Sequence, residues 1–273
     1  MRCIFCKKNS KNSVSIEHVI PESLGNSKLI LPKGAVCDSC NNYFATHLEK
    51  QVLESGEFSY LRFNQELRNK RGKVPEVDIL FGDHIVKARR LGKLEFAFGP
   101  DDFNKIQKYL SKSNKREMKI PVTGESPDDV LTSRWLAKMA LEMLAHKWLK
   151  IDRWNDQIVE HEGLNPIRQY ARAPMRGETW NYSKRRIYDN NAKILAPNGQ
   201  RGQMLYECDI LATGTAESSE FYFVVAFFGM EYAINIGGNS MDGYYEWLKC
   251  HNDVSPLYIR NNSVEPVSEL EHR

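Results

Sequence analysis

Two Cys-x-x-Cys pairs frame a Glu-His dipeptide near the start of the chain. Cys3 and Cys6 form the first pair, and Cys37 and Cys40 form the second. In a reducing compartment, two such pairs are typical of a tetrahedral zinc site with four thiolate ligands. A redox role is disfavoured, because a redox Cys-x-x-Cys follows a strand in a βαβ setting and Cys3 lies too early in the chain. We therefore predict a structural zinc ion held by these four cysteines.

The residues between and after the two pairs follow a recognisable order. The segment SIEHVIPESLG occupies residues 15–25, and VCDSCNN occupies residues 36–42. Together with the first Cys-x-x-Cys pair, this order resembles the HNH endonucleases, in particular those whose ββα-metal finger is pinned by a four-cysteine zinc. The resemblance covers about residues 1–50. It implies an endonuclease that hydrolyses phosphodiester bonds of DNA with one divalent ion, Mg²⁺ or Mn²⁺.

The resemblance assigns catalytic roles to His18, Glu17 and Asn41. A histidine can act as general base near neutral pH, because its unperturbed pKa is about 6.5. A carboxylate and an amide oxygen suit a hard divalent ion, which takes up charge on the leaving oxygen. The resemblance therefore implies that His18 is the base and that Glu17 and Asn41 are ligands of the catalytic ion. Glu17 stands where many members of the family carry Asp.

A third ligand of the catalytic ion is less clearly indicated. Glu49 lies eight residues after Asn41, and at 100° per residue it returns to the same face of an α-helix. We expect Glu49 to be an extra ligand or to contact one, while His47 points away. Asn42 is an alternative to Asn41 as the amide ligand.

The zinc explains why the cysteines lie where they do. A hairpin and one helix cannot bury enough apolar surface to fix a site by themselves. The four thiolates would tie the strand before His18 to the start of the helix that bears Asn41. Cys208 and Cys250 have no neighbouring ligands in the sequence, and we expect them to be buried core thiols.

Composition and charge indicate a globular protein with a basic and an acidic portion. Of 273 residues, 41% are hydrophobic and 27% charged, and no apolar run is long enough to span a membrane. No signal peptide is visible, so we expect a cytoplasmic protein. Residues 207–273 carry 11 acidic and 3 basic residues, whereas residues 1–206 carry a net charge of +11. This asymmetry favours a nucleic-acid-facing portion joined to an acidic one.

We predict an α+β protein of two domains. Residues 1–55 would form the HNH ββα-metal module, and residues 56–273 a larger α+β domain with antiparallel strands, serving substrate recognition or regulation. Within it, residues 77–91 predict a hairpin across Gly82-Asp83, and residues 126–150 predict a buried central helix that is apolar nearly all round. Three apolar segments after residue 202 predict consecutive antiparallel strands.

Basic segments at 62–73, 105–119 and 168–186 are candidates for phosphate contacts. Solvated charged faces are an equally good interpretation of any one of them. The residues that we single out for nucleic-acid binding are Arg62, Arg68, Lys70, Arg71, Lys115, Arg116, Arg185 and Arg186.

Two other functions compete with the nuclease. The first is a non-catalytic zinc-ribbon protein that binds nucleic acid, in which Glu17 and His18 would have no role. The second places the chemistry in the C-terminal portion, where no catalytic signature is visible. RNA as a substrate and a homodimer that cuts both strands both stay open. A restriction or phage-defence role is an analogy with proteins of this size.

Overall fold

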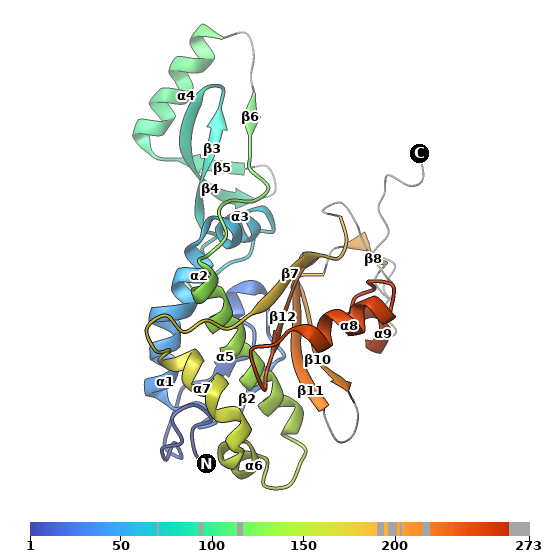
Figure 1. Cartoon of the computed structure of the whole chain (residues 1–273). Helices are drawn as coiled ribbons and strands as arrows, with labels where there is room; N and C mark the ends of the chain where they lie inside the picture. The colour runs from blue at the N-terminus through green and yellow to red at the C-terminus, as the bar shows by residue number, and fades with distance from the viewer. Residues whose placement is uncertain are drawn as a thin grey trace. The chain divides into compact units, whose positions relative to one another are not determined.

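The structure is a computed structural model that describes residues 1–69, 71–92, 95–113, 117–189, 194–195, 201–202, 204–214 and 219–261 (Figure 1). The chain forms two compact units. The first contains Met1–Ile20, Asn26–Leu48 and Asp129–Arg273, and the second contains Pro21–Gly25 and Glu49–Asp128. The fold class is α+β, as predicted.

The first unit is built on a four-stranded antiparallel sheet in the order β10-β11-β12-β7. Strand β11 is buried over its last six residues, within the apolar run that begins at Phe221. The consecutive antiparallel strands expected after residue 202 are therefore confirmed. The bounds of the four strands are β7 Tyr182–Arg186, β10 Tyr206–Gly214, β11 Ser219–Phe227 and β12 Met230–Asn235.

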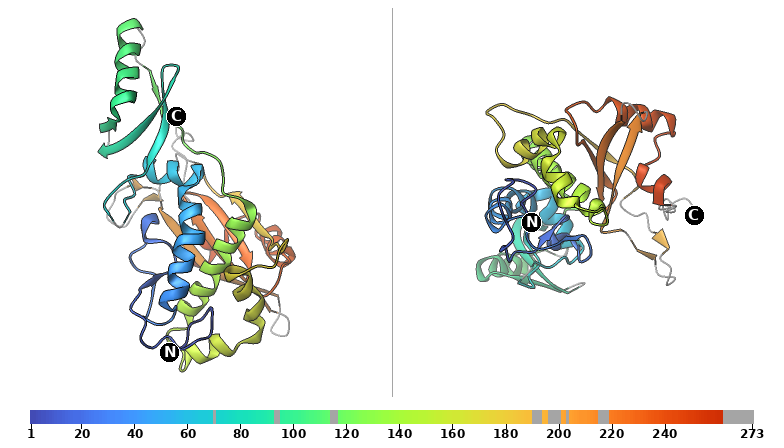
Figure 2. Two further views of the ribbon diagram at one scale, coloured as in Figure 1. Left: turned by 90° about the vertical axis from the view of Figure 1, so that its left-hand side faces the viewer. Right: turned by 90° about the horizontal axis from the view of Figure 1, so that it is seen from below.

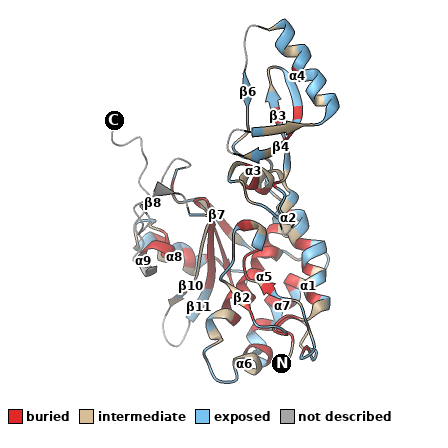
Figure 3. Ribbon diagram, turned by 180° about the vertical axis from the view of Figure 1, so that it is seen from behind, coloured by how far each residue is buried: buried red, intermediate tan, exposed pale blue. Residues whose placement is uncertain are grey.

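Helices cover both faces of this sheet. On one face lies α5 (Asp129–Trp148), and on the other lie α8 (Asp242–Cys250) and α9 (Pro256–Asn261) (Figure 2). Helix α5 is buried over most of its length (Figure 3), and its Trp135 ring stacks on Phe227 of the sheet at 5.4 Å between centroids. The predicted buried central helix is confirmed.

Two further helices of the first unit pack beside α5. They are α6 (Trp154–Glu160) and α7 (Asn165–Arg172), joined by the 3-10 turn η3 (Glu162–Leu164). The Tyr170 hydroxyl of α7 lies 2.6 Å from the Ser133 hydroxyl of α5, a buried hydrogen bond between the two helices. A short pair of strands, β8 (Ile194–Leu195) and β9 (Arg201–Gly202), is antiparallel.

The N-terminal finger consists of short elements. Strand β1 (Glu17–His18) pairs with β2 (Ile30–Leu31), and helix α1 runs over Asp38–Phe44. The helix expected from Asn41 begins three residues earlier, because the Cys37 sulfur accepts a hydrogen bond from the Cys40 amide and caps it. A π-helical segment, η2 (Ala45–Glu49), follows α1.

The second unit has its own antiparallel sheet, in the order β5-β4-β3-β6. The predicted hairpin across Gly82-Asp83 is confirmed, and Gly82 has a φ of +59°, which favours glycine. Its apolar cluster joins the sheet to Phe63 and Ile106 from two helices. The elements of this unit are η1 Glu22–Leu24, α2 Lys50–Glu54, α3 Gly56–Asn64, β3 Glu76–Phe81, β4 His84–Gly92, β5 Glu95–Phe98, α4 Pro100–Lys112 and β6 Met118–Lys119.

The two cysteines outside the N-terminal cluster differ in burial. Cys208 is partly buried and burial raises its pKa to about 12, whereas Cys250 is exposed at the end of α8. The expectation of a buried core thiol is therefore wrong for Cys250. Across the described part of the chain, no helix combines the length and apolar character that a membrane span requires.

The stability of the first unit should depend on the protonation of Glu207 in β10. Burial raises the pKa of this carboxyl to about 7, from an ordinary value of 4.5. Between these two values the folded protein binds more protons than the unfolded chain, so this group's contribution to stability decreases as pH rises. Glu207→Gln should therefore raise the free energy of unfolding by about 3 kcal/mol at pH 8 relative to wild type, with little gain near pH 4.5. Urea unfolding at both pH values tests this, with the exposed Glu246→Gln as control; a gain that does not depend on pH would contradict it.

Candidate functional site

The four N-terminal cysteines converge on one point. Their sulfur atoms all lie within 4.8 Å of one another, and the Sγ atoms of Cys6 and Cys37 are 3.6 Å apart. Tetrahedral zinc with Zn–S bonds of about 2.3 Å places its sulfur ligands about 3.8 Å apart. Within the described residues, this is the one group of three or more Cys, His, Asp or Glu side chains close enough to hold a metal. The geometry fits a four-thiolate zinc.

The protonation of these thiols also suits metal binding. The Cys40 thiol donates to Cys3 and lowers the pKa of Cys3 to about 5, while burial raises the pKa of Cys6. Thiolates, not thiols, are metal ligands. The cluster thus holds one sulfur in the ligand form near neutral pH, and binding of a zinc ion would displace the remaining protons.

Local turns bring the two cysteine pairs together. The first pair lies on a tight loop closed by a bridge between Arg2 and Asn9, in which the Cys3 amide donates to Lys8 O. Lys7 has a φ of 60° in this loop. The second pair begins α1, so one zinc would join the loop and the helix.

Glu17 and His18 are the two residues of strand β1, and they differ in burial. Glu17 is buried with 7% exposure, whereas His18 is half-buried. Asp38 holds the chain just before this strand: its Oδ1 accepts hydrogen bonds from the amides of Val14 and Ser15 at 3.1 and 2.8 Å. The first residue of α1 therefore helps to fix the position of β1.

Asn26 closes the loop between β1 and β2, and the sequence did not single it out. Its side-chain nitrogen donates to Ile20 O and Leu29 O, and its oxygen accepts from the amides of Lys28 and Leu29. Asparagine is common in turns because its side chain bonds to nearby backbone. Only its burial, at 1% exposure, distinguishes it from an ordinary loop residue.

The structure brings Glu17 and Asn41 together across the finger. The Asn41 Nδ2 atom donates to Glu17 Oε2 at 2.7 Å and to Ile16 O at 3.3 Å. A carboxylate and an amide at this separation supply oxygen ligands, which hard divalent ions prefer. The structure thus brings together two of the residues that the sequence predicts as ligands of the catalytic ion.

Lys138 of α5 also reaches Glu17, although no pattern in the sequence indicates this contact. Its Nζ atom lies 2.7 Å from Glu17 Oε1 and 2.9 Å from Glu142 Oε2, and the side chain has no exposed area. Its ammonium also lies 6.0 Å from the centre of the Phe44 ring of α1. The candidate site thus receives a buried cation from a helix outside the finger.

The two remaining candidates, Asn42 and Glu49, follow Asn41 in α1 and in η2. Glu49 ends the π-helical segment η2, so the 100° count from Asn41, which assumes a regular α-helix, does not apply to it directly. Asn42 is exposed, and its carbonyl accepts a hydrogen bond from Thr46. Glu49 stays a prediction as a ligand.

The predicted nucleic-acid contacts differ in exposure. Arg68 and Arg71 are exposed, whereas Arg62 is buried and burial lowers its pKa. Arg185 donates to the buried Glu231 at 2.6 Å, and Arg186 donates to the carbonyls of Tyr188 and Phe228. The other three, Lys70, Lys115 and Arg116, lie outside the described residues.

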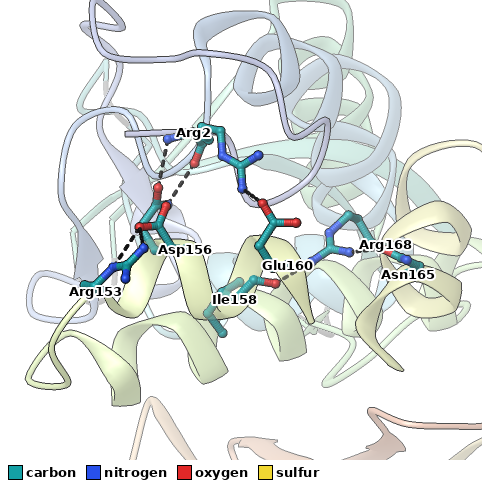
Figure 4. A network of polar contacts seen from close by, with 8 residues as sticks. Arg2, Arg153, Asp156, Ile158, Glu160, Asn165 and Arg168 are labelled. Carbon is teal, nitrogen blue, oxygen red and sulfur yellow. Dashed lines mark hydrogen bonds and ion pairs between the residues drawn. The ribbon is translucent and has the colours of Figure 1, made fainter. Parts of the chain in front are cut away.

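A polar network ties the cysteine loop to α6 and α7 (Figure 4). Arg168 donates to Ile4 O and to Ile158 O, and Arg2 pairs with Glu160. The Arg2 backbone also exchanges two hydrogen bonds of 2.8 Å with the Asn155 side chain. The cysteine loop is therefore fixed to the C-terminal part of the first unit.

Zinc binding can be tested with single cysteine variants. Wild type should contain about one zinc ion per chain. Cys40→Ser should lose most of it and unfold at a temperature several degrees lower, because metal binding contributes to folding free energy. Elemental analysis and thermal unfolding measure both effects. Cys250→Ser is the matched control, since this cysteine is exposed and outside the cluster; full zinc content in Cys40→Ser would contradict the assignment.

Comparison with known proteins agrees with the geometry. Residues 3–55 match the family model described as HNH endonuclease. No curated protein and no solved structure matches the chain. The matched segment contains the four cysteines together with Glu17, His18 and Asn41, and it ends well before α5. The match confirms the resemblance of this segment to the HNH endonucleases and indicates, in general terms, a nuclease.

Proposed function

We propose that the protein is a metal-dependent HNH endonuclease that hydrolyses phosphodiester bonds of DNA. One observation carries the proposal: Asn41 lies 2.7 Å from the Glu17 carboxylate, next to His18, in the segment that matches the family. A zinc ribbon that only binds nucleic acid has no use for a carboxylate and an amide held together beside a histidine.

His18 is the proposed general base. It directly follows Glu17 in β1, so the two Cα atoms are about 3.8 Å apart. Its side chain is half-buried, so water can reach the imidazole. A neutral imidazole can take a proton from a water molecule that attacks the scissile phosphate.

Glu17 and Asn41 are the proposed ligands of the catalytic ion, with Glu49 as a further candidate. When bound there, Mg²⁺ or Mn²⁺ would stabilise negative charge on the leaving oxygen. Asn41 donates to Glu17 in the structure, and a half-turn of its amide exchanges nitrogen for oxygen at the same position.

The residues after the finger are proposed to select the substrate or to regulate cleavage. The exposed Arg68 and Arg71 suit contacts with phosphates, which give affinity without sequence information. One site per chain cuts one strand at a time, so double-strand cleavage would favour a homodimer with two-fold symmetry. By analogy, we place the enzyme among restriction or phage-defence nucleases in the cytoplasm.

The proposal predicts that His18→Ala loses cleavage but not zinc. Wild type should nick plasmid DNA with Mg²⁺ or Mn²⁺ and stop when EDTA is added. His18→Ala should be slower by about 10²- to 10⁴-fold, because it lacks the base. Gel assays of nicked and linear plasmid measure the rate, and zinc analysis shows that the finger is intact.

The control is His84→Ala, which removes an exposed histidine of the second unit and should cut like wild type. Equal cleavage by wild type and His18→Ala would place the activity outside the finger. If wild type cuts no plasmid, the same pair should be tested on RNA and on single strands. Tight binding of all of them without cleavage would favour the zinc-ribbon alternative.

A further inference from the structure

Helix α5 carries three charged residues on the face that meets the finger. Arg134, Lys138 and Glu142 are spaced four residues apart, so they lie one above the other. Arg134 Nη2 donates to the Tyr43 hydroxyl of α1 at 2.9 Å, whereas Lys138 reaches the Glu17 carboxylate. Two side chains of one helix thus contact the finger at two different places.

The burial of Lys138 needs an explanation beyond packing. Lys138 and Glu142 both have 0% exposure, and removing charges from water is costly. Apolar side chains of similar size would hold α5 against the finger at least as well. The two oxygens of the Glu17 carboxylate have different partners: Oε1 accepts from the Lys138 ammonium, and Oε2 accepts from the Asn41 amide.

We propose that Lys138 is a positioning residue that orients the Glu17 carboxylate and limits its affinity for the catalytic ion. This inference rests on the proposed function, because it concerns the same ion site. The ammonium fixes one carboxylate oxygen by a directional hydrogen bond and leaves the side toward Asn41 for the ion. The ammonium also neutralises part of the negative charge of Glu17 that attracts a divalent ion. The Glu142 carboxylate accepts a second hydrogen bond from the ammonium and offsets part of its positive charge.

The test is the double variant Lys138→Met/Glu142→Gln, which removes the ammonium together with its compensating carboxylate. It leaves one buried carboxylate, Glu17, without the ammonium, whereas Lys138→Met alone leaves two, Glu17 and Glu142. Calorimetric titration with Mn²⁺, on zinc-loaded protein without nucleic acid, should show binding tighter than wild type by at least about fivefold, because the repulsion from the ammonium is gone. Cleavage at saturating Mn²⁺ should be slower, because Glu17 is no longer held.

Two further variants complete the design. Arg134→Met removes the neighbouring tie to Tyr43 without contacting Glu17, so it should lower stability and leave Mn²⁺ affinity unchanged. Lys138→Arg keeps the cation and should bind Mn²⁺ close to the wild-type affinity. If the double variant does not fold, the single variants Lys138→Arg and Glu142→Gln still test the effect of the ammonium on the affinity for Mn²⁺. Mn²⁺ binding is expected to be weaker in Glu142→Gln, because the ammonium then lacks its compensating carboxylate.

The outcomes separate this inference from the proposed function. If the folded double variant binds Mn²⁺ with unchanged or lower affinity, Lys138 only joins α5 to the finger and the inference is overturned. It is likewise overturned if Glu142→Gln binds Mn²⁺ as wild type does. If wild type binds no Mn²⁺, or if Glu17→Gln leaves its binding unaltered, the ion site itself is wrong and both proposals fall.

Discussion

The position of Glu17 depends on buried charges that helix α5 carries. Lys138 and Glu142 lie within the helix that forms the centre of the first unit, and the Lys138 ammonium bridges the two carboxylates. Three residues before Lys138, Trp135 stacks on Phe227 of the four-stranded sheet. The sheet therefore fixes the helix, and the helix in turn fixes the carboxylate at the candidate site.

The finger could not hold this arrangement by itself. Its strands are two residues long, and a few short elements bury too little apolar surface for independent stability. Two supports make up for this. A zinc on the four thiolates would join the cysteine loop to α1, and Arg168 ties the same loop to α7 through the carbonyl of Ile4. Most of the segment that matches the family, residues 3–20 and 26–48, is thus part of a larger folded unit.

Local features of the fold and the site could be predicted from the sequence, whereas distant ones could not. The cysteine spacing, the Glu-His dipeptide and the Gly82-Asp83 hairpin are short-range patterns with a direct physical meaning. Lys138 lies 121 residues from Glu17, and no periodicity distinguishes a lysine that binds a carboxylate from one that faces solvent. The regular helix expected after Asn41 is interrupted by a π-helical segment, which propensity does not reveal. Cys250 is expected inside because cysteine is usually buried, yet it lies at an exposed helix end.

The contacts across the finger differ in how strongly they fix the orientation of a side chain. Apolar packing, such as that of Phe5 on Phe44, excludes water but tolerates small rotations of a side chain. Hydrogen bonds to a carboxylate are directional, so Lys138 and Asn41 together define the plane of the Glu17 carboxylate in a way that packing does not. Because Lys138 comes from α5, a shift of that helix along the sheet would turn this plane. The orientation of the Glu17 carboxylate is therefore coupled to the C-terminal sheet through a helix that contacts both.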